Sequence, residues 1–314
     1  MNDHIEITKH LENKDRLNLG HLQYVSEYAS GLVKYSVKGC REMEVDYNPQ
    51  QNNIKLKGSP MYFIQGHNFT YNKPNFIEAI KHIEGLLHID LFDSYLERFE
   101  YGNILKVDKK PQWIIEGHLP GNGLTMDERS KDRGNIRYFN DSTISAKLYN
   151  AGLNIQHKQG LKMKEIIQQA GWNPKDYFVK FEVVHKKPHI SLNNGKGLIL
   201  SDILVPSFEK MLKADLYKQY QRIKKMKSIE IPSSKKDLSS GNIILLAMAE
   251  MALNEGKDLK NLIHSLLKSI PDEVLSSEDK KARRKQIKAM LEKIHSSENS
   301  EYDLSEQLAE ALKD

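Results

Sequence analysis

The stretch that decides the fold is STISAKLYNAGLNI, residues 142–155. Read with a period of two residues, it places Lys147 and Tyr149 on one face of a β-strand and Ala146 and Leu148 on the other. This alternation is typical of an antiparallel sheet with one covered face and one polar face. A tyrosine on such a face is most often a packing residue with a wet hydroxyl, so a reactive role for Tyr149 requires particular neighbours.

Length and composition limit the classes of protein. A chain of 314 residues can form two domains, and no run of about 18 apolar residues or apolar leader is present, so we expect a soluble, cytoplasmic protein without a membrane partner. The single cysteine excludes an internal disulfide framework and a cysteine zinc cluster. The net charge of +5 favours a polyanionic partner. Lysine and arginine cluster at 218–227 and 280–288, although both runs could instead be solvated helix faces.

The order of patterns along the chain predicts an α+β protein. Residues 33–70 read as an antiparallel meander, and a helix follows from Pro74. Further strands are expected at 95–105, 112–119 and 177–187, with a hairpin at 135–150 and a short helix at 162–171. Helical patterns then cover 206–227, 241–253, 257–269, 277–295 and 303–313. We therefore expect an antiparallel sheet packed by helices in residues 1–204 and an all-helical C-terminal region in residues 205–314.

Two other predicted strands also have a polar face. YLERFEYG, residues 95–102, places Arg98 and Glu100 on one side, and YFVKFEVV, residues 177–184, places Lys180 and Glu182 on one side. Glutamate is depleted in strand interiors unless something makes use of it. The sequence therefore predicts a sheet face on which carboxylates lie beside basic residues.

Carboxylates that converge on a sheet suit a hard divalent cation, Mg²⁺ or Mn²⁺. Such an ion can polarise a phosphodiester, and a tyrosine beside it can attack phosphorus. In this interpretation Tyr149 is the nucleophile, Lys147 favours its phenolate, and Glu100 and Glu182 hold the metal. The alternative is an ordinary solvated sheet face with cross-strand ion pairs.

Residues 57–71, KGSPMYFIQGHNFTY, resemble the segment that ends in Gly-His-Asn in the replication initiation endonucleases of filamentous phages, the gene II/X type. That family is related more distantly to the plasmid rolling-circle initiators. The order of later motifs is also similar: a helix, a strand with Arg98-Phe99-Glu100, the strand AKLYNAGLNI, and a strand with Phe181-Glu182. The resemblance spans roughly residues 30–215.

The resemblance implies an HUH-like or RRM-like nuclease core and a rolling-circle replication initiator. Tyr149 would cut one strand, leaving a 5′-phosphotyrosyl link and a free 3′-hydroxyl, and would later rejoin the displaced strand. Glu100 and Glu182 carry over as metal ligands and His67 as a further ligand, although His67 could instead belong to a turn. Tyr138 is a further candidate for strand rejoining.

The partners expected are double- and single-stranded DNA at a replication origin, and a host helicase, in a bacterial cytoplasm. Two alternatives stay open: a non-catalytic DNA-binding regulator of replication or transcription, and a mobilisation relaxase. Phosphate contacts are predicted for basic residues of the sheet and of the helices at 208–227 and 277–295, namely Arg98, Lys180, Arg222, Lys224, Lys225, Arg283, Arg284 and Lys285.

Overall fold

The computed structural model describes residues 2–13, 15–38, 40–127, 134–227, 240–255, 259–291 and 302–313. Contacts divide the chain into two units, one formed by residues 1–224 with 304–314 and the other by residues 225–303. The sequence placed a domain boundary after residue 204, whereas the helix that follows this point packs within the first unit. Each unit is described by itself.

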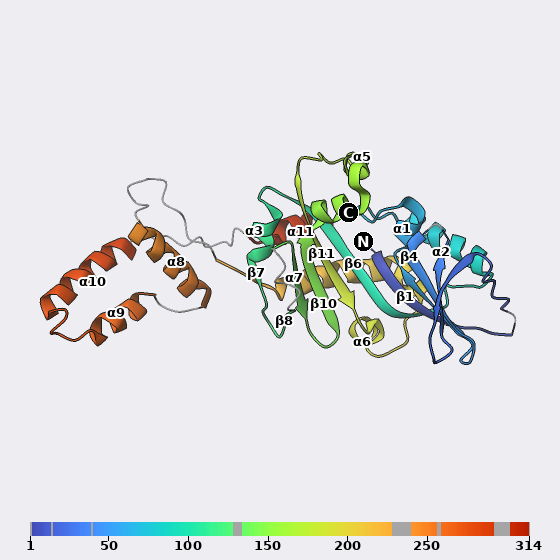
Figure 1. The fold of residues 1–314 in the computed structure, drawn as a ribbon, viewed down its shortest axis with the longest axis horizontal. Coiled ribbons are helices and arrows are strands. Elements are labelled where there is room, and N and C mark those ends of the chain that lie inside the picture. The colour runs from blue at the N-terminus through green and yellow to red at the C-terminus, as the bar shows by residue number, and fades with distance from the viewer. Residues whose placement is uncertain are drawn as a thin grey trace. The chain divides into compact units, whose positions relative to one another are not determined.

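The first unit is built on one antiparallel sheet of ten strands (Figure 1). The order is β2-β3-β4-β5-β1-β6-β11-β10-β9-β8. The first strand, β1, and the last strand of this sheet, β11, therefore both pair with β6 in the middle of the sheet. The strands are β1 (Asn2–His10), β2 (Leu22–Glu27), β3 (Val33–Val37), β4 (Cys40–Asn48), β5 (Asn53–Gly58), β6 (Tyr95–Val107), β8 (Thr125–Met126), β9 (Ile136–Asn140), β10 (Ile144–Asn150) and β11 (Tyr177–His185). A separate two-stranded sheet joins β7 (His118–Leu119) and β12 (Lys224–Lys225).

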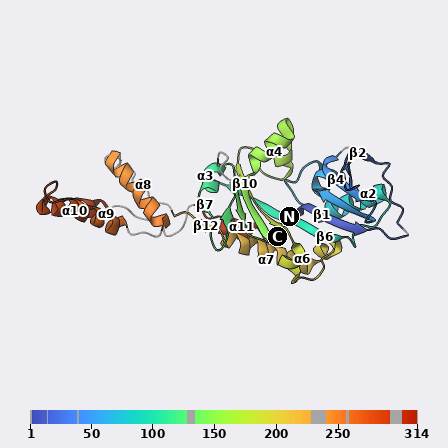
Figure 2. The ribbon, with the colours of Figure 1, turned by 60° about the horizontal axis from the view of Figure 1, so that its bottom comes forward.

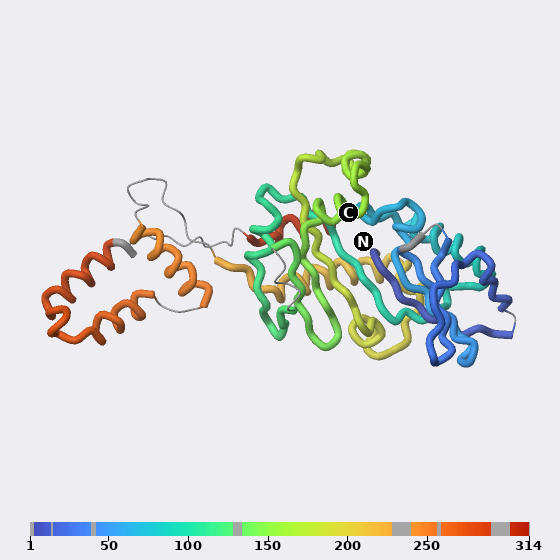
Figure 3. The backbone as a smooth tube through the Cα atoms, in the orientation of Figure 1, coloured from blue at the N-terminus to red at the C-terminus, as the bar shows by residue number. Residues whose placement is uncertain are grey.

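Strand β1 lies in the centre of the sheet, between β5 and β6, and was not predicted from the sequence. Ile5 and Ile7 are buried in the core, which is the alternation of a half-covered strand. The tube in Figure 3 shows β1 running beside β6 near the middle of the sheet. The first residues of the chain therefore reach the same face as the predicted polar strands.

One face of the sheet carries the main core. Phe99, Phe181 and Val183 are fully buried on it, beneath helices α2 (Lys73–Leu87) and α7 (Pro206–Gln221). The opposite face of the sheet packs on α4 (Ala151–Gln159) and α5 (Met163–Gln169) through a smaller apolar cluster. Figure 2 shows α4 and α7 on opposite sides of the strands. The predicted alternation of the central strands is confirmed.

Two predicted strand segments are short helices instead. Residues 60–65 of the expected meander form α1 (Pro60–Gln65), whose first turn is capped by the Ser59 hydroxyl and which ends at Gly66 with φ 76°. Residues of the expected strand at 112–119 form α3 (Pro111–Glu116), followed only by β7. Both helices have proline at the start, where its fixed φ and missing N–H suit a helix. Short apolar runs cannot separate helix from strand by period alone.

The other predicted elements of the first unit are confirmed within a few residues. The hairpin of β9 and β10 turns after Asn140, and β6 and β11 pair antiparallel beside it. Residues 188–193 and 200–204 add short helical segments, α6 (Pro188–Asn193) and η3 (Leu200–Leu204), and η2 (Gly160–Lys162) precedes α5. Near the end of the chain, α11 (Ser305–Ala311) packs against β6 and α7.

The described residues of the second unit are mostly helical. Its helices are α8 (Ser240–Glu255), α9 (Leu259–Ser269) and α10 (Ser277–Leu291). Ala249, Ala252 and Leu259 form a small core between α8 and α9. A mostly helical C-terminal region is thus confirmed. Across both units, the described helices include none with the length and apolar character needed to cross a bilayer.

Candidate functional site

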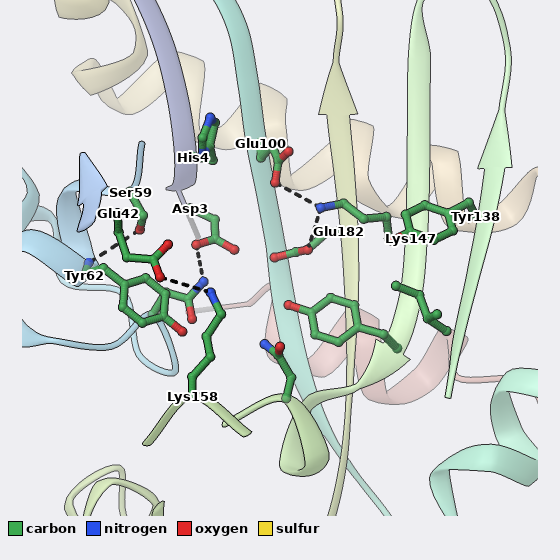
Figure 4. A pocket seen from close by; sticks show the side chains of 14 residues that line it. Asp3, His4, Glu42, Ser59, Tyr62, Glu100, Tyr138, Lys147, Lys158 and Glu182 are labelled. Carbon is green, nitrogen blue, oxygen red and sulfur yellow. Dashed lines mark hydrogen bonds and ion pairs between the residues drawn. The ribbon is translucent and has the colours of Figure 1, made fainter. Parts of the chain in front are cut away.

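The polar face of the central strands contains a pocket of about 260 Å³ (Figure 4). Five residues singled out from the sequence line it together: Glu100 from β6, Tyr138 from β9, Lys147 and Tyr149 from β10, and Glu182 from β11. The strand register explains this, because Lys147 pairs with Glu182 and Tyr149 with Lys180 across β10 and β11. The remaining lining residues are Asp3, His4, Glu42, Ser59, Tyr62, Asn68, Ile136, Asn154 and Lys158.

Three carboxylates converge at the pocket. Asp3, Glu100 and Glu182 each offer an oxygen, and these oxygens lie within 4.8 Å of one another. Glu182 is only 2% exposed, and Asp3 and Glu100 are also buried. Buried carboxylates are rare unless they are paired or bind a cation. The arrangement is therefore one that could hold a divalent metal ion.

A β-bulge aims Asp3 at the site. Asn2 pairs with Tyr101 and His4 pairs with Glu100, so Asp3 is one extra residue on its strand. An extra residue of this kind bends the strand and redirects its side chain, and bulges are common beside active sites. Asp3 was missed from the sequence, because the segment that contains it was not recognised as a strand.

A glycine lets β11 come close enough to bring in Glu182. A Cβ atom on Gly102 would lie 2.3 Å from the Phe181 carbonyl oxygen and 2.6 Å from Glu182 Cγ. Gly102 faces Glu182 directly in the pairing of β6 with β11. A larger residue at this position would move the backbone of β11, and with it the buried carboxylate.

Two lysines neutralise most of the carboxylate charge. Lys147 Nζ lies 3.0 Å from Glu100 Oε2 and 3.3 Å from Glu182 Oε2, and Lys180 Nζ lies 2.7 Å from Asp3 Oδ2. Burial alone would lower the pKa of Lys147, but the carboxylates of Glu182 and Glu100 raise it above its usual range. Lys180 behaves in the same way. Burial alone would lower its pKa, but the carboxylates of Asp3 and Glu182 raise it well above its usual range. Both lysines are therefore ammonium ions at neutral pH.

The three carboxylates fit a metal ion on geometry and on hydrogen bonding. Glu182 Oε1 is buried and forms an ion pair with Lys180 Nζ at 2.6 Å, but it has no hydrogen-bond partner of regular geometry. Oxygen donors on a buried, acidic surface are the ligands that Mg²⁺ and Mn²⁺ prefer. Lys147, whose ammonium lies between Glu100 and Glu182, would have to move aside for a metal held by all three carboxylates.

The electrostatic surroundings of Tyr149 oppose its ionisation. Burial raises the pKa of Tyr149 well above its usual range, and the carboxylates of Glu182 and Asp3 raise it further, against the lowering effect of Lys180. Among the charged neighbours, Glu182 has the largest effect on this pKa. Tyr149 is thus a neutral phenol at neutral pH unless more positive charge enters the pocket.

Burial and neighbouring charges also shift the pKa values of Asp3 and of a second tyrosine, Tyr62. Burial favours the neutral form of Asp3, but the Lys180 ammonium prevails and lowers the pKa of Asp3 below its usual range. Asn68 supports it by donating from Nδ2 to Asp3 Oδ1. Across the pocket, burial and then Asp3 raise the pKa of Tyr62, which belongs to α1. Tyr62 was missed because residues 60–65 were read as a strand.

A further cation, Lys158, also lines the pocket. Its Nζ lies 4.4 Å from the centre of the Tyr62 ring and 3.7 Å from Glu42 Oε1. Figure 4 shows Lys158 reaching toward Glu42 and Tyr62 from below. The residue follows Tyr149 on the next helix, and only that proximity in sequence could have indicated it.

The structure does not bring His67 to the carboxylates. His67 Nδ1 accepts a hydrogen bond from the Phe69 N–H at 3.3 Å, and Gln65 donates to the His67 carbonyl oxygen at 3.0 Å. Burial lowers the pKa of His67, which favours the neutral, accepting ring. The arrangement matches the turn that was the alternative for this residue, and its neighbour Asn68 reaches the site instead.

Among the predicted phosphate contacts of the first unit, Arg98 lies at the edge of the cluster, 3.3 Å from Glu100. Lys180 differs from its prediction, because its buried ammonium is already paired with the carboxylates of Asp3 and Glu182. Arg222 binds Asp141 Oδ2 at 2.8 Å and thereby braces the β9–β10 turn. Lys224 and Lys225 lie in β12, and burial lowers the pKa of Lys225.

The other predicted contacts lie on α10. Arg283 and Lys285 are exposed and Arg284 is half-buried, and Arg283 donates to Gln286 at 3.2 Å. Lys280, in the same basic run, is instead buried and donates to Asp272 at 2.6 Å. The cationic surface of α10 is therefore formed by the residues after its first turn.

No protein-family model, curated protein or solved structure matched the chain.

Proposed function

We propose that the protein is a metal-dependent, strand-nicking DNA endonuclease that initiates rolling-circle replication, similar to the initiation endonucleases of filamentous phages. The single observation that carries this proposal is the pocket where Tyr149 meets three buried carboxylates. A protein that only bound DNA would have no need for buried acids next to a tyrosine, because acids repel phosphates.

The proposed reaction transfers a phosphoryl group to tyrosine. Tyr149 Oη forms a bond to phosphorus as the bond from phosphorus to the 3′ oxygen breaks, which leaves a 5′-phosphotyrosyl link and a free 3′-hydroxyl. The phenol proton passes to the carboxylate of Glu182, which lines the same pocket as Tyr149. The leaving oxygen takes a proton from the ammonium of Lys147, which leaves its ion pairs with Glu100 and Glu182 when a metal takes its place.

Asp3, Glu100 and Glu182 would hold a Mg²⁺ or Mn²⁺ ion in this proposal. When bound, the ion would supply positive charge that favours both the phenolate and the developing charge on the phosphodiester. This charge offsets the effect of Glu182 and Asp3, which raise the pKa of Tyr149 in its absence. The negative charges of Glu182 and Asp3 thus oppose formation of the Tyr149 phenolate until a bound cation balances them.

The proposed partners follow from this reaction. The substrate is a duplex replication origin of a phage or small mobile element, from which one strand is nicked and displaced, with a helicase of the bacterial host to separate the strands. The setting would be the host cytoplasm. A mobilisation relaxase would use the same chemistry on a transfer origin, and the choice between them depends on the DNA sequence that is cut.

A second function, a DNA-binding regulator without catalysis, is favoured by one observation. Lys147 and Lys180 already pair with the three carboxylates, so the site is close to electrical balance without a metal. Cross-strand ion pairs of this kind also occur on sheets with no active site. Activity is therefore what separates the two functions.

The test is conversion of supercoiled plasmid carrying the origin to open circle, with Mg²⁺ or Mn²⁺ and with a chelator. The wild-type protein should nick only with metal, and Tyr149→Phe should nick at least a thousandfold more slowly, since only the nucleophilic oxygen is lost. Tyr138→Phe is the matched control, because Tyr138 lines the same pocket on the neighbouring strand. Equal nicking by the Tyr149 and Tyr138 variants would contradict the assignment.

A further inference from the structure

A second and larger pocket, of about 460 Å³, adjoins the carboxylate pocket. The two share Asp3 and Asn68 as a common wall. The second pocket extends along Gly102 to Ile104 of β6, the residues that follow Glu100 on the same strand. Its volume falls within the range of roughly 300 to 1,000 Å³ that small-molecule sites occupy.

One wall of this second pocket is aromatic and fixed in place. Trp172 and Phe69 line it, and the Trp172 ring stacks on Phe178 at 4.9 Å between centroids with an angle of 12°. Phe69 packs edge-on against Trp172 at 5.3 Å and against Phe178 at 5.6 Å. Rigid aromatic side chains beside a basic surface are how proteins bind unpaired bases without reading the sequence.

Another part of the lining is basic. Lys73 and Lys213 both approach a single carboxylate, Glu209, and each ammonium lies 3.9 Å from it. Ion pairs this long and partly exposed contribute little, so either lysine can turn to another anion. With Lys180 and Asp3, which also line the pocket, the charged side chains of its lining carry a net charge of +1. The pocket therefore offers an aromatic surface and a cationic surface to the same ligand.

We propose that this second pocket binds one nucleotide, with its base on the Trp172 side and its phosphate at Lys73 and Lys213. Resting on the proposed function, the nucleotide belongs to the strand whose scissile phosphate lies in the carboxylate pocket. The common wall of Asp3 and Asn68 makes the two pockets neighbouring sites on one chain of DNA. A base held there would be unpaired, so the pocket selects single-stranded substrate.

Trp172 makes the binding observable without catalysis. The chain has only two tryptophans, and the other, Trp113, is half exposed on α3 and can be replaced by phenylalanine. In a W113F/Y149F variant with chelator present, titration with a single-stranded oligonucleotide should quench the fluorescence of Trp172 to saturation. A deoxynucleoside monophosphate should give the same quenching at higher concentration, because it contacts only this pocket and lacks the contacts that the rest of an oligonucleotide makes. Duplex DNA of the same sequence without an unpaired segment should not quench.

Two lysine substitutions supply an independent measurement. The K73Q/K213Q variant should bind a fluorescently labelled oligonucleotide about tenfold more weakly, and the slope of log affinity against log salt should fall by about 0.7 for each lost phosphate contact. Lys34→Gln is the matched control, because Lys34 also pairs with one glutamate, Glu44, but lies on β3. The control should leave both the affinity and the salt slope unchanged.

The outcomes separate this inference from the proposed function. Quenching of Trp172 without any nicking by the wild-type protein would support the nucleotide pocket and contradict the nuclease. Metal-dependent nicking with no quenching, and with no effect of K73Q/K213Q, would overturn the pocket and leave the nuclease standing. Quenching by the mononucleotide but not by the oligonucleotide would also overturn the inference, since the ligand would then be a free nucleotide.

Discussion

The two faces of strands β6, β10 and β11 are buried in different ways. Phe99, Phe181 and Val183 point to a closely packed apolar core, while Glu100 and Glu182, which alternate with them, point to buried charges. Burial of apolar surface stabilises a fold, whereas a buried ion pair is often no more stabilising than apolar side chains of the same volume. The apolar face therefore explains the stability of the fold. The buried charges of the other face do not contribute in the same way, so a functional role is the better explanation for them.

The largest effect expected is on the apolar face. Phe181 is fully buried and meets the Tyr220 ring edge-on at 5.2 Å, so Phe181→Ala should lower the free energy of unfolding by about 3–5 kcal/mol. Arg98→Ala, on the charged face, removes a partly exposed ion pair and should cost less than about 1 kcal/mol. Urea denaturation measures both. Equal losses would mean that the charged face carries as much stability as the core.

The second prediction concerns the carboxylates. With Mn²⁺ at a hundred times its dissociation constant, the wild-type protein should gain about 2.7 kcal/mol of stability, and Glu182→Gln should abolish most of this gain and slow nicking at least a hundredfold. Glu100→Gln, which also removes a ligand, should weaken both effects. Thermal denaturation with and without metal measures the gain, and a gain that persists in both variants would show that the carboxylates hold no metal.

Glu182→Gln should also change the titration of Tyr149. Because the Glu182 carboxylate raises the pKa of this phenol, its removal should lower the pKa toward the ordinary value near 10. Glu100→Gln should have the smaller effect, since burial, Glu182 and Asp3 are what raise this pKa. Nuclear magnetic resonance of tyrosine labelled at Cζ can follow the titration. An unchanged pKa in the Glu182 variant would place the phenol away from that carboxylate.

A smaller effect is expected from α10, in the second unit. Reversing Arg283, Arg284 and Lys285 to glutamate should weaken binding to all DNA sequences by about the same factor and lower the salt slope by about one unit for each lost contact. Nicking of a bound single-stranded oligonucleotide should persist, because the carboxylates and Tyr149 lie in the first unit. A full salt slope in the variant would mean that α10 binds something other than DNA.

The smallest effect concerns the turn that precedes the tyrosine strand. Burial favours the neutral form of Asp141, but the backbone N–H groups of Ile144 and Thr143 and the Arg222 guanidinium lower its pKa to about 2. A lowered pKa contributes stability that is complete above about pH 4 and is lost as the pH falls through 2. Asp141→Asn should therefore lower the melting temperature by a few degrees at pH 7 and by less at pH 3. A pH-independent difference would show that charge at this turn is unimportant.

Alternation in the sequence predicted much of the fold and part of the site. The faces of Glu100, Tyr149 and Glu182 follow from a period of two residues, and their meeting in one pocket follows from antiparallel pairing. The role of Asp3 could not be predicted from the sequence, since its orientation depends on a bulge and on long-range pairing with β6. Tyr62 was lost with α1, because a six-residue helix has too few turns to show its period.

The predicted role of Lys180 shows a second limit. The period placed Lys180 correctly on the polar face, but pattern alone gives neither burial nor partners. The ammonium is enclosed by Asp3 and Glu182, and Asp3 was not known to be there. Charged side chains on a sheet can therefore be assigned to a face from the sequence, while their roles depend on what the rest of the chain brings to them.

The most direct test of the central claim is mass spectrometry of the wild-type protein after reaction with Mg²⁺ and a suicide single-stranded oligonucleotide that is cut near its 5′ end, so that the short fragment with the 3′-hydroxyl dissociates and cannot be rejoined. We predict a covalent adduct whose mass equals the protein plus the 5′-phosphorylated 3′ fragment less one water, with peptide fragmentation assigning the 5′-phosphate to Tyr149. The Tyr149→Phe variant should give no adduct under the same conditions. Cleavage without an adduct, or an adduct on another residue such as Tyr62, would contradict the account of Tyr149 as the nucleophile.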